Sequence, residues 1–224
     1  MGKNRVMIIG LVLLGLVAVL LFFGVAERIF KSFGVKYWLA FVMVGALIGC
    51  AFIPSFAIGK VTFNVAGFIA PVVFAIIFFV LARRTHEVWR ALIALSAVTA
   101  LFVGIWLLIE PITSDTVSVL IVGFLCGAIA FLVAKTKLAA LAAVFGGIPT
   151  GEIISAAVNV YVSDAPMRFG NAAAFDAVIL AAVFAVALYE AVAAIKRAMN
   201  ARAAVTAETA EEFDPDEYKR YFDE

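Results

Sequence analysis

Charged residues are scarce in this chain. Asp, Glu, Lys and Arg together supply 15% of its 224 residues, whereas hydrophobic residues supply 66%. A water-soluble domain cannot hide so much apolar surface, so the composition excludes a soluble globular protein. It predicts a polytopic membrane protein instead.

The residue types that carry metal and redox chemistry are also few. His86 is the only histidine and lies in a basic connector without a metal-ligand cluster around it. The two cysteines, Cys50 and Cys126, fall in different apolar runs, which argues against a disulfide framework. The chain lacks a phosphate-binding glycine loop, a serine-nucleophile motif and a zinc-protease helix motif. We therefore predict no metal, no cofactor and no catalytic residue, and an enzyme is not favoured.

What the chain has in abundance is long apolar runs. A bilayer core is ~30 Å thick and a helix rises ~1.5 Å per residue, so ~20 residues cross it. Barrel strands would alternate polar and apolar residues, so the continuous runs indicate helices. We predict an all-α membrane protein in which residues 1–195 form seven transmembrane helices. The candidate spans are Val6–Phe23, Trp38–Phe56, Val61–Leu81, Ala91–Ile109, Val117–Ala134, Leu138–Val158 and Ala172–Ala194. The first span has an alternative interpretation as a cleaved signal peptide.

Basic residues alternate along the connectors and predict the orientation. The basic connectors are 27–37, 82–90, the residues after Ala134 and those after Ala194, whereas Glu110, Asp115 and Asp164 occupy the opposite side. The positive-inside rule then places the C-terminus in the cytoplasm and the N-terminus outside. Residues 196–224 are predicted to form a cytoplasmic acidic tail. We expect the protein in the cell membrane of a bacterium or archaeon.

A short internal similarity suggests a repeat. Residues 64–70 read Asn-Val-Ala-Gly-Phe-Ile-Ala and residues 171–177 read Asn-Ala-Ala-Ala-Phe-Asp-Ala, and an Ile-Pro pair occurs in the span before each. Two units with the same orientation need a linker span between them. We therefore predict a 3+1+3 parallel-repeat bundle with repeats 6–81 and 117–194 and a linker helix at 91–109, a design found in transporters. Chance similarity in an apolar chain is the alternative.

Intramembrane ionisable residues are costly and suggest function. Glu152 lies about 9 Å below the outer end of the sixth span, and Asp176 lies about 6 Å into the seventh. We predict that the two carboxyls meet in a polar pocket open to the outer face and bind a proton or cation. The predicted pocket comprises Asn64, Pro71, Glu152, Asn171 and Asp176. A break of the sixth helix is predicted at Gly147, Pro149 and Gly151. The alternative is two solvated carboxyls in a shallow interface.

Glycine pairs at a spacing of four, such as Gly45 and Gly49, indicate close helix contacts. The segment 64–71, with Asn64, Gly67 and Pro71, resembles the Asn-Val-Gly-Gly…Pro motif of a bacterial and archaeal membrane family designated domain of unknown function sixteen-fourteen. Segments 150–152 and 173–177 resemble its Gly-Ala-Asp and Gly-Thr-Phe-Asp-Gly motifs, although Glu152 replaces Asp and alanines replace glycines. The resemblance covers most of residues 20–190 and implies a membrane location.

Three function classes follow from these patterns. A small-solute or ion transporter is favoured by the repeat, the helix break and the carboxyl pair. A non-transporting accessory or assembly membrane protein, with a cytoplasmic partner for the tail, is the close alternative. An intramembrane aspartyl protease is a distant third, because Glu152 stands where that chemistry needs Asp. The expected partners are the lipid bilayer, an unknown solute or cation and, as an open alternative, further copies of the chain, with no nucleic acid.

Overall fold

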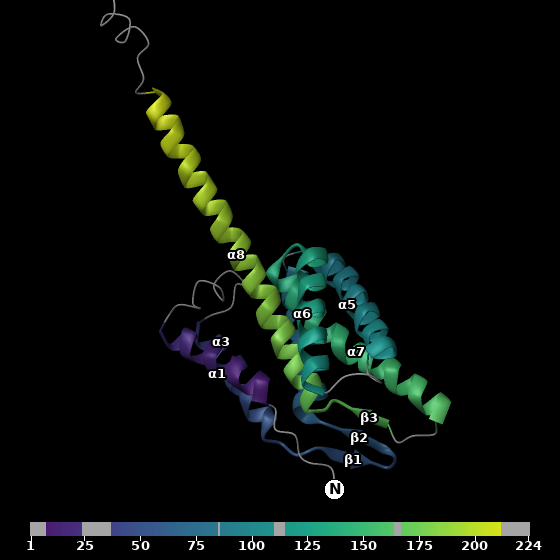
Figure 1. Ribbon diagram of the computed structural model, residues 1–224. Coiled ribbons are helices and arrows are strands. Elements are labelled where there is room, and N and C mark those ends of the chain that lie inside the picture. Colours follow the sequence, from purple (N-terminus) through teal and green to yellow (C-terminus); the bar gives the residue numbers. More distant parts are fainter. Residues whose placement is uncertain (1–7, 24–36, 85, 110–114, 164–166, 212–224) are drawn as a thin grey trace, which may run out of the picture. The chain divides into compact units, whose positions relative to one another are not determined.

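Figure 1 shows the computed structural model of the chain, which describes residues 8–23, 37–84, 86–109, 115–163 and 167–211. The predictions for connector residues 27–36, for Glu110 and Asp164, and for the tail beyond residue 211 lie outside the described residues. The chain forms two units, Met1–Ala187 and Leu188–Glu224. Among the described residues of the second unit, Arg197 lies 3.8 Å from Glu190.

Every predicted span contains a helix in the part that the structure describes. The helices are α1 (Ile8–Phe22), α3 (Tyr37–Ala51), α4 (Ala70–Arg84), α5 (Val88–Ile109), α6 (Asp115–Ala134), α7 (Lys137–Ser163) and α8 (Ala172–Glu211). Continuous apolar sequence favours this outcome because a helix satisfies all of its own backbone hydrogen bonds within the bilayer.

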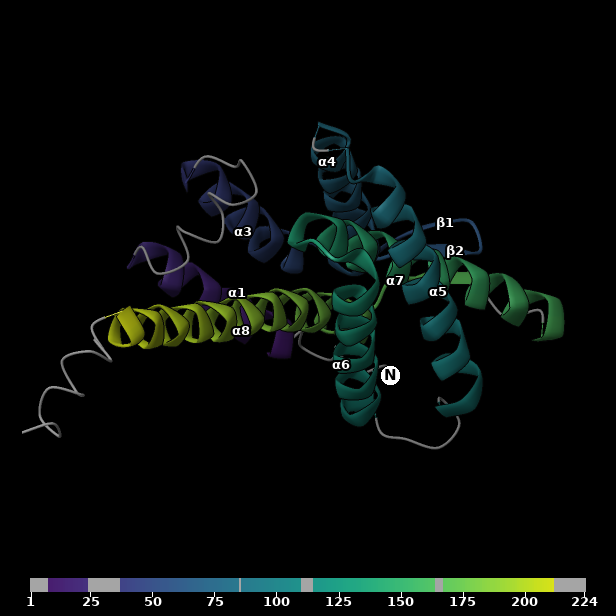
Figure 2. The same ribbon diagram turned by 90° about the horizontal axis from the view of Figure 1, so that it is seen from above.

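Five helical segments are long and apolar enough to cross a membrane: α5, α6, α7, α8 and the continuous segment Val65–Arg83, which contains most of α4. They give the chain the character of a multi-pass membrane protein. The prediction of seven full spans is not confirmed, because α1 and α3 each have only 15 residues. That length corresponds to about 22 Å, which is less than a bilayer core of ~30 Å. The two short helices lie side by side (Figure 2).

A three-stranded sheet lies at one end of the helices of the first unit (Figure 1). Strands β1 (Phe56–Ile58) and β2 (Val61–Phe63) form an antiparallel hairpin, which turns at Gly59 with φ 63°. Strand β3 (Met167–Phe169) pairs with β2 in parallel, with Phe63 opposite Phe169. The described chain is mainly helical as predicted, but Phe56 and residues 61–63, which were placed in spans, form strands instead. Strand pairing between segments about 100 residues apart overrides their local apolar pattern.

The core of the first unit is built around α7. In the apolar stretch of α7, 61% of the residues are buried inside the protein, against 28% in α5 and 33% in α6. The run from Leu138 to Phe145 is buried throughout and contains four alanines, so the neighbouring helices can approach closely. Rings of α4 and α7 also meet, with Phe145 5.8 Å from Phe74 and 5.4 Å from Phe78. This packing positions α7 against β3 of the sheet.

A π-helical turn, η1 (Val65–Ile69), connects the sheet to α4. The amide of Ala70 donates to the carbonyl of Val65, which widens the turn by one residue. Pro71 follows at once and is fully buried. A proline lacks an N–H and its ring clashes with the carbonyl four residues earlier, so the wider turn suits it. Within the predicted span Val61–Leu81, the α-helix therefore begins only after β2 and this turn.

Candidate functional site

The site grows from two parallel strands that each lead into a helix through an asparagine. After β2, the Oδ1 of Asn64 accepts the amide of Gly67 at 2.7 Å. After β3, the Oδ1 of Asn171 accepts the amide of Ala174 at 2.7 Å. Each asparagine therefore caps the helix that follows it, at the same spacing of three residues. The capped ends are the N-termini of η1 and of α8, and both carry partial positive charge.

These two helix starts touch through their backbones. A Cβ added to Gly67 would lie 2.6 Å from the carbonyl oxygen of Asn171. A Cβ added to Gly170 would lie 2.7 Å from the carbonyl carbon of Gly67 and from the amide nitrogen of Phe68. Gly170 also has φ +70°, a conformation that glycine adopts without strain. Only residues without a side chain fit at both positions, so glycine makes this contact possible.

Glu152 reaches this contact from α7. Its Oε2 accepts the amide of Gly170 at 3.0 Å, and its side chain is partly exposed. We call the group formed by Asn64, Gly67, Glu152, Gly170 and Asn171 the strand-end junction. Here a carboxylate lies directly before the positive end of α8, a position that stabilises negative charge. Its partner is a neutral backbone amide rather than a cation.

Asn64 is the most heavily bonded member of the strand-end junction. Its backbone amide donates to the carbonyl of Phe169 at 2.9 Å, and its Nδ2 donates to the Oγ of Ser55 at 3.0 Å. Together with the bond to Gly67, these contacts use its donors and its side-chain acceptor. Asn64 therefore holds β2, β3 and η1 together and positions the junction.

Asp176 has a different partner. Its side chain is 6% exposed, and its Oδ1 accepts the amide of Gly10 at 2.8 Å. The backbone of Ile9 is a second hydrogen-bond partner of the same carboxylate. Ile9 and Gly10 follow the first residue of α1, so Asp176 satisfies amides that have no partner within that helix. The carboxylate of α8 thus caps α1 from another part of the chain.

Gly10 is needed for this contact. A Cβ there would lie 2.8 Å from the Oδ1 of Asp176 and 2.8 Å from the ring of Phe175. Glu152 and Asp176 therefore have separate backbone donors, in the strand-end junction and in α1 respectively. A pocket shared by the two carboxyls stays a prediction.

The predicted break in the sixth span is wrong. The helix α7 runs without interruption from Lys137 to Ser163 and contains Pro149. Hydroxyl groups supply donors to the carbonyls beside the proline, since Thr150 donates to Gly146 at 2.7 Å and Thr99 of α5 donates to Gly147 at 3.0 Å. Such side-chain bonds let a membrane helix continue past proline.

The glycines of α7 serve helix packing. An added Cβ would lie 2.8 Å from Val98 at Gly147 and 2.5 Å from Phe102 at Gly151. Both neighbours belong to α5, whose axis can approach closely because these side chains are missing. These two glycines therefore belong to the α5–α7 contact rather than to a break.

The apolar pattern of the sequence did not predict the aromatic cluster that packs on the sheet. Phe63 of β2 stacks on Phe56 at 5.8 Å and on Phe169 of β3 at 5.3 Å. Phe68 of η1 lies 5.3 Å from Phe169. These rings stabilise the pairing of β2 with β3 and so fix the register at which the Asn64 amide meets the carbonyl of Phe169. Gly10 and Gly170 were also not predicted as site residues, because a glycine in a membrane sequence can serve helix packing or a turn as well as a polar site.

Comparisons with family models, with curated proteins and with solved structures found no match to this chain. Within the described residues, no group of three or more His, Cys, Asp or Glu side chains is arranged to hold a metal ion. Function must therefore be argued from the strand-end junction itself. The resemblance to the domain of unknown function sixteen-fourteen family remains a prediction.

Proposed function

We propose that the protein moves a small solute or an ion across the membrane and that Glu152 is the group that changes its charge during transport. The observation that carries this proposal is the bond between Glu152 and the amide of Gly170 at 3.0 Å. Glu152 is an ionisable residue within an apolar helix, and such residues mark ion paths and proton relays by default.

The electrostatics of the strand-end junction support this role. A carboxylate removed from water needs a strong compensating partner. Here the compensation comes from one neutral amide and from the partial positive charge at the start of α8. Addition of a proton or a cation removes the negative charge and weakens the hydrogen bond from the Gly170 amide. Glu152 can therefore loosen the junction when it is neutralised.

The backbone around the strand-end junction has features of known transport sites. Transporters place their sites where helices are interrupted and where helix N-termini point at the solute. Here η1 forms an irregular first turn of the helix that continues as α4, and its N-terminus touches that of α8 at Gly67 and Gly170. The proposal includes membership of the domain of unknown function sixteen-fourteen family, which the sequence resembles.

Proteoliposomes test the proposal with the proton as the probe. The purified chain is reconstituted into vesicles that contain the pH indicator pyranine. A potassium gradient with valinomycin sets up a membrane potential that drives proton entry. The outside solution contains sodium or chloride salts. We expect a proton flux well above that of empty vesicles, and its loss in Glu152→Gln, which retains an acceptor for Gly170. Glu190→Gln is the matched control, because Glu190 has a cation partner, Arg197, in the second unit. Equal flux in wild type and Glu152→Gln would refute the role of Glu152.

An accessory or assembly protein is the second candidate, and α3 supplies a specific observation for it. Gly45 and Gly49 are exposed, and an added Cβ at either position meets nothing within 4 Å. The other glycine pairs at this spacing contact a neighbouring helix, since Gly123 meets Leu180 and Gly151 meets Phe102. A cysteine at the neighbouring Ala46 tests this candidate through cross-linking in native membranes. A discrete cross-linked product that is lost in Gly45→Leu would favour it.

A further inference from the structure

Two connectors are joined at the end of the helices that lies away from the sheet. The α4–α5 connector supplies Glu87 and the α6–α7 connector supplies Thr136, whose Oγ1 donates to the Glu87 Oε2 at 2.8 Å. The same Oγ1 accepts the amide of Ala139 at 3.3 Å and so caps α7. Left-handed residues shape both turns, with φ 58° at His86 and 60° at Lys135. The bond fixes the two connectors side by side.

The joined connectors carry cations that are exposed on the surface of the protein. Arg83, Arg90 and Lys135 are all exposed. The carboxylate of Glu87, by contrast, is partly buried and is occupied by Thr136. Arg83 at the end of α4, Arg90 at the start of α5 and Lys135 between α6 and α7 therefore lie at the same end of the helices, and the acidic Glu87 between them is already bonded. We call Arg83, Trp89, Arg90 and Lys135 the connector surface.

Apolar surface continues directly from these cations. Trp89 is 76% exposed beside Arg90, and Ile93, one turn further along α5, is 61% exposed. On α4, Val80 is 53% exposed one turn before Arg83. Tryptophan favours the boundary between headgroups and acyl chains, and arginine favours phosphate. A charged rim above an exposed apolar face matches the shape of a phospholipid, with its headgroup above its acyl chains.

We propose that the connector surface is a binding site for anionic phospholipid headgroups. The cations attract the headgroup phosphate and its net negative charge, and Trp89 lies at the level of the ester groups. Each basic residue near a membrane surface strengthens binding to anionic lipid by about fivefold. The inference does not depend on transport, since it uses none of the residues of the strand-end junction.

Tryptophan quenching by brominated lipids tests this proposal. The full-length chain with Trp38→Phe and Trp106→Phe retains Trp89 as its single tryptophan. It is reconstituted into vesicles of phosphatidylcholine with increasing shares of phosphatidylglycerol, and either lipid carries bromine in turn. We expect preferential quenching by brominated phosphatidylglycerol, and a preference about 25-fold lower in Arg90→Gln/Lys135→Gln, which lacks two of the cations.

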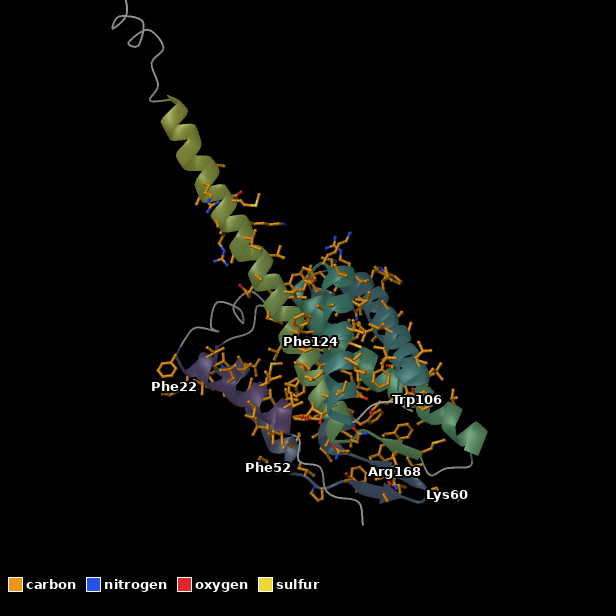
Figure 3. All side chains as sticks on the ribbon, viewed as in Figure 1. Phe22, Phe52, Lys60, Trp106, Phe124 and Arg168 are labelled. Atoms are coloured by element: carbon orange, nitrogen blue, oxygen red, sulfur yellow. The ribbon has the colours of Figure 1, made fainter. Side chains whose placement is uncertain are left out.

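A charge-matched control is available at the other end of the same helices. Lys60 and Arg168 lie at the sheet, as Figure 3 shows, and both are exposed. Lys60→Gln/Arg168→Gln changes the net charge by the same amount, and we expect it to leave the quenching at Trp89 unchanged. Arg90→Lys/Lys135→Arg preserves the charges and should keep the preference, which excludes misfolding as the cause of its loss.

Two results would overturn the proposal. One is equal quenching of Trp89 by both brominated lipids when all the cations are present. This result would favour an acidic polypeptide as the partner of the connector surface. The other is a preference that survives in Arg90→Gln/Lys135→Gln or that falls equally in the Lys60 and Arg168 control. A preference that is present in wild type, weakened by added salt and lost only in the first pair supports the site.

Discussion

The contact between Gly67 and Gly170 allows a sharp test of the strand-end junction through Gly67→Ala. The new methyl group would lie 2.6 Å from the carbonyl oxygen of Asn171 and 2.8 Å from its amide nitrogen. The shorter distance falls about 0.8 Å short of ordinary contact at 3.4 Å. The obstructing atoms belong to the backbone, which cannot rotate away as a side chain would. The starts of η1 and α8 must therefore separate.

The size of the effect follows from what this separation disturbs. Overpacking by one methyl group in a tight site costs about 1–3 kcal/mol. The bond from the Asn64 amide to Phe169, at 2.9 Å, crosses the same contact, and the bond from Gly170 to Glu152, at 3.0 Å, lies next to it. Weakening one of them costs a further ~1 kcal/mol. We expect Gly67→Ala to lower the free energy of unfolding by about 2–4 kcal/mol.

Gly104→Ala provides the matched control. Gly104 lies inside α5, and an added Cβ there meets nothing within 4 Å. Alanine is a better helix former than glycine by about 0.5–1 kcal/mol, so this variant should be as stable as wild type or slightly more stable. The two variants make the same chemical change in opposite surroundings.

Unfolding in mixed micelles of dodecyl maltoside and increasing sodium dodecyl sulfate, followed by tryptophan fluorescence and circular dichroism, measures both variants. If Gly67→Ala unfolded at the same detergent fraction as Gly104→Ala, the two helix starts could not be in contact as described. A destabilisation of both variants by the same amount would point to a general intolerance of glycine replacement and would refute the geometric argument as well.

Two further predictions concern bonds between distant parts of the chain. Asp176→Ala should destabilise the start of α1 by about 1–3 kcal/mol, because the amide of Gly10 loses its acceptor, whereas Asp176→Asn keeps an acceptor and should cost less than about 1 kcal/mol. Hydrogen exchange of the first turn of α1 measures this effect, and equal exchange in both variants would contradict it. Thr99→Val should destabilise the protein by about 1 kcal/mol through the lost bond to Gly147, with Ser96→Ala, whose bond is exposed, as a near-neutral control in the same unfolding assay.

The sequence by itself determined the class of the protein and the presence of its helices. Apolar runs such as 117–134 and 91–109 correspond to α6 and α5 within three residues at each end. This succeeds because hydropathy is a local property and because a chain in lipid must satisfy its backbone bonds within the same segment. The asparagines at positions 64 and 171 could also be read locally, since both precede a helix and cap it.

Only the tertiary structure decided where helices give way to strands and what each polar group binds. Strands of three residues carry no periodic signal, and β2 exists because β3, from a distant segment, supplies its partners. Pro149 predicted a break, yet Thr99 of another helix supplies a donor at this point of α7. The sequence predicted that Asp176 meets Glu152, but the hydrogen-bond donor to Asp176 in the structure is Gly10, which is 166 residues away along the chain. Local sequence sets which segments are helical, whereas contacts between distant segments select the partner of each buried polar atom, because an unpaired one is costly wherever the chain places it.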